Sequence, residues 1–83
     1  MIVKDWTING HRYVVEALKV GVDKYGGTYT LEESYDDFPI EEADDYRVER
    51  ECCPVNGYWC EVGEYYYMTL EEAVAAAEKE ANE

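Results

Sequence analysis

The sequence has little positive charge, and this shortage excludes several classes of partner. Seven Lys and Arg stand against twenty Asp and Glu, so the formal net charge is −13 at pH 7. A polyanion of this kind is repelled by nucleic acid and by anionic membrane surfaces. We therefore expect no direct binding of nucleic acid and no membrane partner.

Residues that commonly perform catalysis are also scarce. His11 is the only histidine, and it directly follows an Asn-Gly pair that is typical of an exposed turn. The chain contains no glycine-rich phosphate loop, no nucleophile elbow and no zinc signature. We predict that the protein is not an enzyme, and we expect no cofactor and no metal.

The cysteines are few and odd in number. Cys52, Cys53 and Cys60 fall short of the four ligands of a structural zinc site, and His11 is distant in sequence. In a reducing compartment such cysteines are expected to be free thiols, one or two of them buried as small apolar residues. A disulfide between Cys53 and Cys60 is geometrically possible across a hairpin, but cytosolic chemistry disfavours it.

Long apolar segments are absent as well. No stretch approaches the roughly 20 apolar residues that span a bilayer. The first residues, which include Lys4 and Asp5, contain no apolar run of signal-peptide length. The expected location is the cytosol.

Aromatic residues, in contrast, are abundant. The chain has two Trp, one Phe and nine Tyr, and 47% of its residues are hydrophobic. A disordered acidic tail would be poor in aromatic residues. We therefore expect one folded domain over residues 1–83, with a thin core, because a chain this short buries only about 60–65% of its unfolded surface.

The first part of the chain has the pattern of a β-hairpin. Ile2 to Ile8 and His11 to Leu18 flank Asn9-Gly10, which supplies the positive φ angles of a two-residue turn. Apolar residues in 12–25 also recur at helical spacing, so a helix there is the alternative; Gly21 and the β-branched residues favour strand. The cross-strand pairs expected from the hairpin are Trp6 with Tyr13 and Lys4 with Val15.

The middle of the chain combines a turn, a short strand and an acidic loop. Residues 24–27 have turn composition, and Thr28 to Glu33 has strand composition. Residues 34–45 contain three pairs of adjacent acids and Pro39, which excludes a central strand. We expect Phe38 and Ile40 to anchor this loop to the core.

A second hairpin is predicted around Asn56-Gly57. Its arms are Tyr46 to Cys53 and Tyr58 to Met68, with Gly63 as a bulge or a further turn in the second arm. The register predicts three cross-strand pairs, namely Cys53 with Cys60, Val48 with Tyr65 and Tyr46 with Tyr67.

The last predicted element is a helix with a clear start. Thr69 has the spacing of an N-cap, with Glu72 completing a capping box. An apolar stripe follows, made of Leu70, Ala73, Val74, Ala77 and Ala81. The predicted fold class is α+β: an antiparallel sheet of four or five strands with one C-terminal helix packed on one face.

The acids are concentrated in one stretch, where ten of the twenty residues from Glu32 to Glu51 are acidic. Three interpretations compete. The carboxylates can imitate phosphates, they can bind calcium, or they can only keep a small protein soluble. The spacing lacks the alternate positions and the glycine of a calcium loop, and solubility explains a smaller charge more easily. The phosphate-mimic interpretation is therefore preferred.

Clustered tyrosines are the second candidate feature. Tyr65, Tyr66 and Tyr67 must divide between two sheet faces, so at least one points away from the core. Most of the nine tyrosines are expected to pack in the core or at its edges. Tyr66, Trp59 or Tyr58 can instead form an aromatic anchor within an acidic rim.

The chain resembles proteins of phages and mobile elements. The features that carry the resemblance are its size and charge, its hairpins closed by Asn9-Gly10 and Asn56-Gly57, and its segment Met68-Thr69-Leu70-Glu71-Glu72-Ala73-Val74. Within that group it is similar to the anti-CRISPR and anti-restriction inhibitors that mimic DNA. The resemblance implies a target in the cytosol of a host bacterium, namely a nucleic-acid-binding defence complex such as CRISPR-Cas that is blocked at its DNA-binding groove.

From these observations we predict a monomeric, non-enzymatic inhibitor that binds a basic nucleic-acid-binding protein or complex. An alternative is an acidic interaction module, of the immunity or adaptor kind, that binds a basic protein through exposed tyrosines. A third is a small phage protein that self-associates. The predicted partner-binding residues are Glu32, Glu33, Asp36, Asp37, Glu41, Glu42, Asp44, Asp45, Glu71, Glu72, Glu78 and Tyr66.

Overall fold

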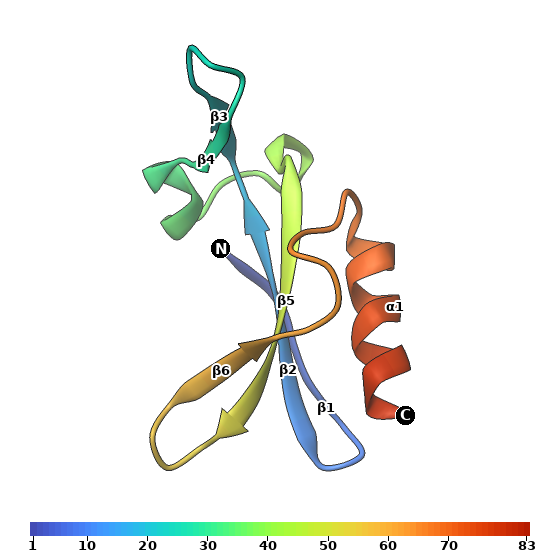
Figure 1. The fold of residues 1–83 in the computed structure, drawn as a ribbon. Coiled ribbons are helices and arrows are strands. Elements are labelled where there is room, and N and C mark those ends of the chain that lie inside the picture. The colour runs from blue at the N-terminus through green and yellow to red at the C-terminus, as the bar shows by residue number, and fades with distance from the viewer.

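Two β-hairpins, a smaller β-ribbon and one α-helix make up the fold in a computed structural model that describes residues 1–83 (Figure 1). The strands are β1 (Ile2–Ile8), β2 (His11–Leu18), β3 (Val20–Val22), β4 (Thr28–Thr30), β5 (Asp45–Cys53) and β6 (Tyr58–Glu61). Two 3-10 helices, η1 (Glu32–Tyr35) and η2 (Ile40–Glu42), connect β4 to β5, and α1 (Leu70–Ala81) follows β6.

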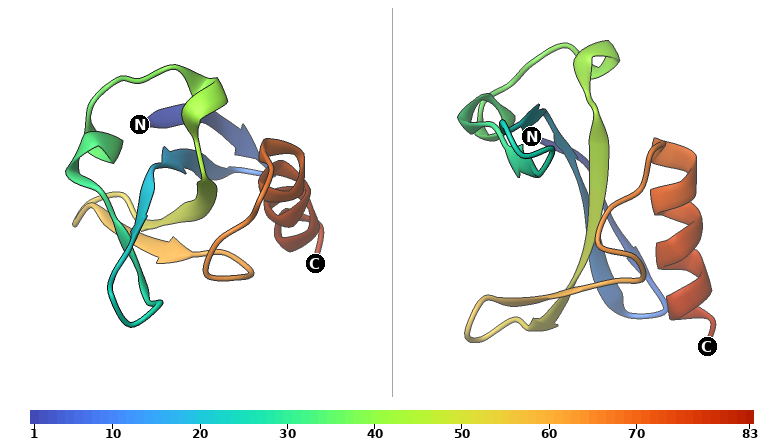
Figure 2. Two further views of the ribbon diagram at one scale, coloured as in Figure 1. Left: turned by 90° about the horizontal axis from the view of Figure 1, so that it is seen from above. Right: turned by 45° about the horizontal axis from the view of Figure 1, so that its top comes forward.

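The main sheet is antiparallel and has four strands in the order β1-β2-β5-β6, while β3 and β4 form a separate two-stranded ribbon. Helix α1 lies on one face of the main sheet, over β5 and β2, and no α-helix lies on the other face (Figure 2). The predicted α+β class, with one helix packed on one face of an antiparallel sheet, is confirmed.

The first hairpin has the predicted register. Asn9 and Gly10 take φ angles of 50° and 83°, and Trp6 pairs with Tyr13. The predicted pairing of Lys4 with Val15 is also present. Strand β2 is buried on both faces, which suits its β-branched residues. The helical alternative for residues 12–25 is wrong, because these residues form β2, β3 and the turn that follows.

The segment after the ribbon is shorter in strand than predicted. Strand β4 ends at Thr30, and η1 begins at Glu32. Within η1 the Ser34 side chain points inward and is completely buried. Of the two predicted anchors, Phe38 packs against the core cluster, whereas Ile40 is 41% exposed and does not. The prediction for Ile40 is wrong.

The second hairpin differs from prediction in its register. Cys53 pairs with Tyr58 across a four-residue loop, so the predicted pairing of Cys53 with Cys60 is wrong. The Asn56 N–H donates a hydrogen bond to the Cys53 carbonyl, and this bond lies within the four-residue loop. A register shift next to Glu51 moves the partners further, and Cys60 pairs with Arg50.

The second arm of this hairpin leaves the sheet earlier than predicted and pairs with β5 again at Tyr67. Gly63 has a φ of 70°, and the chain leaves the sheet there. Val48 therefore accepts its backbone hydrogen bond from Val62, and the predicted pairing of Val48 with Tyr65 is wrong. The predicted pairing of Tyr46 with Tyr67 is confirmed. The residues between these two contacts, including Tyr65 and Tyr66, form an excursion outside the sheet.

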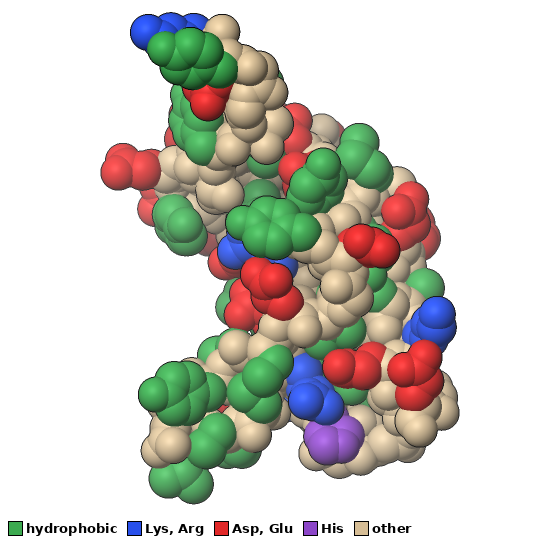
Figure 3. Space-filling model, viewed as in Figure 1, with side chains coloured by type: hydrophobic (Ala, Val, Ile, Leu, Met, Phe, Trp, Pro, Cys, Tyr) green, Lys and Arg blue, Asp and Glu red, His purple; other side chains and the backbone are tan.

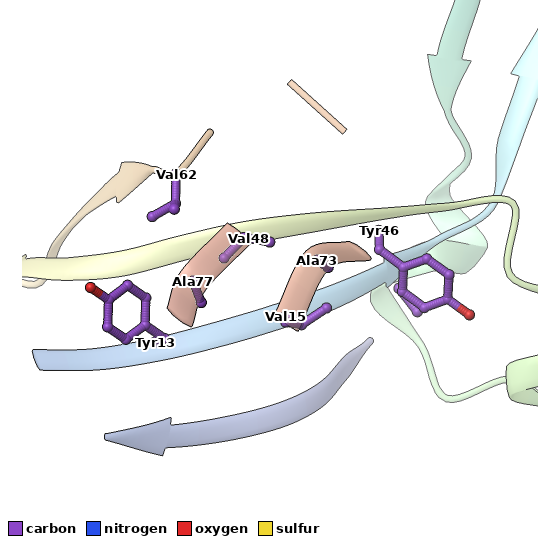
Figure 4. Packing of buried hydrophobic residues seen from close by; sticks show 8 residues of the cluster. Tyr13, Val15, Tyr46, Val48, Val62, Ala73 and Ala77 are labelled. Carbon is purple, nitrogen blue, oxygen red and sulfur yellow. The ribbon is translucent and has the colours of Figure 1, made fainter. Parts of the chain in front are cut away.

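The core lies between α1 and the sheet (Figure 4). Thr69 caps the helix as predicted, because its hydroxyl oxygen accepts a hydrogen bond from the Glu72 N–H at 3.2 Å. The helix presents small residues to the sheet, and both Ala73 and Ala77 are completely buried. Small side chains let the helix axis approach the sheet closely. The buried cluster comprises Tyr13, Val15, Ala17, Tyr46, Val48, Val62, Ala73 and Ala77.

Replacing Val48 by Ala should lower the free energy of unfolding by about 2 kcal/mol, because a side chain that is 1% exposed loses its apolar contacts. Val55→Ala is the matched control, since Val55 is 94% exposed and the same methyl groups are removed. Urea denaturation of both variants provides the measurement. Equal midpoints for the two variants would contradict this position of the core.

A disulfide links Cys52 to Cys60 across β5 and β6, with a Cα–Cα distance of 6.1 Å, and Cys53 is free. The expectation of free thiols is therefore wrong for two of the three cysteines. The observed register explains the change of partner, because Cys60 pairs with Arg50, and Cys52, two residues farther along β5, shares the face of Arg50.

Thiol counting tests this pairing. The oxidised protein, unfolded without reductant, should expose one reactive thiol to a thiol reagent, and Cys53→Ser should reduce this number to none. Cys52→Ser frees Cys60 and should raise the number to two. Three thiols in the wild-type protein purified without reductant would contradict the bond.

Candidate partner-binding site

The carboxylates divide among three surfaces, apart from Asp23 in the β3–β4 turn. The acidic segment, residues 32–44, carries Glu32, Glu33, Asp36, Asp37, Glu41, Glu42 and Asp44. The helix surface, formed by α1 and the adjoining residues 63–67, carries Glu64, Glu71, Glu72, Glu78, Glu80 and Glu83. The open face, meaning the sheet face without the helix, carries Asp5, Glu16, Asp45, Glu49, Glu51 and Glu61.

The acidic segment is held to the strands by hydrogen bonds at both of its ends. The Ser34 hydroxyl accepts a hydrogen bond from the Lys19 N–H at 2.6 Å and donates one to the Lys19 carbonyl at 2.9 Å. The Met1 ammonium donates to the Ser34 carbonyl. At the other end the Asp44 carboxylate accepts from the Val20 N–H at 2.9 Å. The segment is therefore fixed in place although its carboxylates face water.

Some of the predicted partner-binding carboxylates of this segment form contacts within the molecule, and others do not. Glu33 forms an ion pair with Lys19 at 3.0 Å, and Asp44 serves as the anchor just described. The remaining predicted residues are exposed and form no ion pair; they are Glu32, Asp36, Asp37, Glu41 and Glu42. These five carboxylates are available to a partner without breaking an internal contact.

The predicted helix contacts lie on a separate surface. Glu71, Glu72 and Glu78 are exposed on α1, where the first two favour the helix dipole. In each ribbon view α1 and η1 lie on opposite sides of the molecule (Figures 1 and 2). The structure therefore does not bring the acids of η1 and those of the helix onto one continuous surface.

The open face contains ion pairs that also use aromatic rings. Arg12 donates to the Asp5 carboxylate at 2.7 Å and to Glu51 at 3.3 Å, and its guanidinium lies 5.4 Å from the Trp59 ring centroid. These contacts raise the pKa of Arg12, and the hydrogen bond from Arg12 lowers the pKa of Asp5. On the same face Arg47 lies 5.6 Å from the Tyr65 ring centroid.

Carboxylates crowd along β5 on this face. Burial raises the pKa of Glu49, and the nearby charges of Glu16 and Glu61 add to the rise while Arg47 opposes it. Burial and the charge of Asp44 likewise raise the pKa of Asp45. With six carboxylates and two arginines, the face carries more negative charge than its own arginines neutralise.

The open face is hollowed between two projecting hairpins, β3–β4 and β5–β6 (Figure 3). A cavity of about 100 Å³ lies at the β3–β4 end of this hollow. Its lining residues are Leu18, Val20, Thr28, Tyr29, Thr30, Asp45, Arg47, Tyr65 and Tyr66. Two predicted partner-binding residues, Asp45 and Tyr66, thus meet here, away from the exposed acids of the acidic segment.

A second, shallower groove of about 630 Å³ runs between α1 and residues 62–67. Its acids are Glu64, Glu72, Glu80 and Glu83, with Lys79 among them. The Tyr67 hydroxyl closes one end, where it accepts a hydrogen bond from the Glu64 N–H at 2.8 Å. This groove adds to the negative charge of the helix surface.

The sequence analysis did not predict that Glu16, Arg47, Glu49 and Glu61 lie together on the open face. A signal for them was present, because Asp45, Arg47, Glu49 and Glu51 occupy alternate positions of one strand and so share one face. The missing information was which face α1 covers. The excursion at Gly63, which places Tyr65 beside Arg47, had no comparable signal.

The raised pKa of Glu49 predicts a pH dependence of stability. A carboxyl whose pKa is higher in the folded chain disfavours folding when ionised, so stability rises as the pH falls through that raised pKa. As the pH falls from neutrality toward the ordinary glutamate value of 4.5, the free energy of unfolding should therefore increase. Glu49→Gln should be more stable than wild type near pH 7 and should show a weaker dependence on pH.

The control is Glu78→Gln, which removes the same charge from an exposed helix position. It should keep the wild-type pH dependence, as measured by urea denaturation at each pH. The lowered pKa of Asp5 acts in the opposite direction, but only below its ordinary value of 3.8. A Glu49→Gln profile parallel to that of wild type would contradict the prediction.

No group of three or more His, Cys, Asp or Glu side chains is arranged to hold a metal ion, and no helix has the length and apolar character that a membrane span requires. No protein-family model matches the chain, and searches of curated proteins and of solved structures returned no match.

Proposed function

We propose that the protein is a non-enzymatic inhibitor that mimics nucleic acid and occupies the basic groove of a nucleic-acid-binding protein. One observation carries the proposal: of twenty carboxylates, only Asp5, Glu33 and Glu51 form ion pairs within the molecule. Like charges at this density oppose compaction. A partner with a basic surface would neutralise them.

The charge density supports mimicry of a duplex. The molecule measures 42 × 25 × 25 Å. Duplex DNA of that length carries roughly 25 phosphate charges at one per about 1.7 Å of axis. Twenty carboxylates, nineteen of them on the three surfaces, approach that number, and a duplex also presents its charges on more than one side. Fixed carboxylates would displace DNA from a Lys/Arg groove and release the counterions of that groove.

The resemblance in size and charge to phage-encoded inhibitors points to a target class. Bacterial defence complexes, CRISPR-Cas effectors among them, hold nucleic acid in positively charged channels. Action there would place the protein in the cytosol of the host bacterium as a monomer that touches the complex and not the DNA. The exposed carboxylates of the acidic segment are the proposed main contacts.

Competition tests the proposal. A CRISPR effector complex is mixed with its labelled target duplex, and the protein is titrated in while fluorescence anisotropy follows the bound DNA. The protein should displace the duplex, and its affinity should fall at least about tenfold between roughly 50 and 200 mM salt. If the protein displaced DNA from none of a panel of CRISPR and restriction complexes, the proposal would be contradicted. An affinity that does not depend on salt would contradict it as well.

A matched pair of variants tests the surface. Asp36→Lys/Asp37→Lys reverses two charges in the acidic segment, and Glu71→Lys/Glu72→Lys makes the same change in net charge on the helix. The first variant should lose at least about tenfold more inhibition than the second, because complementary charges act over about 10 Å or less. Circular dichroism verifies that both variants are folded.

A second candidate function, an interaction module that binds through tyrosines, is favoured by Tyr66, which remains 47% exposed beside the cavity of the open face. In that case Tyr66→Ala would weaken partner binding more than the loss of two acids would. Tyr35→Ala is the control, because Tyr35 is an exposed tyrosine outside that cavity.

A further inference from the structure

The open face combines carboxylates with aromatic rings in a repeated arrangement. Arg12 is held by two carboxylates and by the ring of Trp59, and Arg47 lies over the ring of Tyr65. A cation over an aromatic face is attracted by the ring quadrupole, and a neighbouring carboxylate adds to the attraction. This face therefore already binds two guanidinium groups of its own chain.

The cavity of the open face is lined by the same kinds of residue, and the pair of Arg47 and Tyr65 forms part of its lining. Tyr29 and Tyr66 line it together with Asp45, and neither of these two rings has a cation–π contact. Tyr29 lies in β4 of the ribbon and is 52% exposed. Exposed tyrosines of this kind are favoured anchors at protein interfaces.

The position of Tyr29 is built into the ribbon. Its ring lies against Gly21 on the paired strand, where a Cβ atom would come within 2.7 Å of the ring. A larger residue at position 21 would displace the ring, so glycine there leaves the space that the ring occupies across the ribbon.

The charge of the open face selects the occupant. Its six carboxylates face two guanidinium groups, and Arg12 is already engaged by Asp5 and Glu51. Burial first, and neighbouring carboxylates second, raise the pKa of both Asp45 and Glu49, and a guest cation would offset the repulsion between these carboxylates. A second copy of this chain, with its net charge of −13, is disfavoured as the occupant.

We propose that the hollow of the open face is a docking site for a Lys/Arg-rich segment of a partner protein, with one cationic side chain received by Tyr29, Tyr66 and Asp45. Glu49 and Glu61, farther along the face, would pair with the next basic residues of the segment. The inference rests on the proposed function in requiring a basic partner, and it adds a contact on a surface other than the acidic segment.

The probe is a hexa-arginine peptide, with a hexa-glutamate peptide as the negative control, added to the ¹⁵N-labelled protein at low salt. The largest amide shifts should fall on β5 and on Tyr29, Tyr65 and Tyr66. Tyr29→Ala/Tyr66→Ala should weaken binding about five- to thirtyfold, as expected for two cation–π contacts. Tyr29→Phe/Tyr66→Phe keeps both rings and should retain most of the affinity and the fold.

Matched controls separate the site from general charge. Tyr25→Ala/Tyr35→Ala removes two exposed tyrosines that do not line the cavity and should leave the affinity within about twofold. Asp45→Asn should weaken binding more than Asp36→Asn, which removes the same charge from the acidic segment. Equal losses in either comparison would overturn the inference.

The outcomes also distinguish this inference from the proposed function. Peptide binding with its shifts confined to the acidic segment or to the helix would overturn the docking site while leaving a basic partner supported. No binding of hexa-arginine to any surface at low salt, or equal binding of hexa-glutamate, would count against both.

Discussion

The packing of α1 against β2 and β5 is the contact on which the rest of this structure depends. The molecule carries a net charge of −13 and has only a small buried cluster to resist its own repulsion. Ala73 and Ala77 allow the helix to lie close to the sheet, and the apolar residues of both strands fill the space between them. The same contact decides which sheet face is covered, so it also creates the open face with its carboxylates and rings.

The distribution of the acids follows from this limited stability. Three surfaces share the carboxylates, and the acidic segment, the longest acidic run, is tied down through Ser34 and the Met1 ammonium by main-chain contacts that do not use its charges. Along β5, burial and neighbouring carboxylates raise the pKa of Asp45 and that of Glu49. Arg47 is the one base at the alternate positions from Asp45 to Glu51, so the strand keeps a net negative charge on this face.

Much of the fold follows from local signals in the sequence, and the errors have a common physical cause. Asn9-Gly10 fixed the first register because a two-residue turn permits only one pairing, and Thr69 marked the start of α1 through a bond within one turn. The register predicted from Asn56-Gly57 was wrong because the loop has four residues. At Gly63 the chain leaves the sheet, so the second arm resumes its pairing with β5 only at Tyr67. Pairing across a longer loop depends on tertiary packing, which no local pattern reports. The open face was missed for the same reason, since its residues come together only when the covered face is known.

Order in the binding surfaces matters for affinity as much as charge does. A disordered acidic tail of equal charge would lose conformational entropy on binding, at a cost for each side chain and backbone unit that becomes ordered. Here the carboxylates stand on a sheet, on two 3-10 helices anchored by Ser34 and Asp44, and on a capped helix. The ring of Tyr29 lies against Gly21. Because these elements are ordered without a partner, more of the electrostatic attraction to the proposed basic partner would remain as binding free energy, as the proposed competition with a nucleic-acid duplex requires.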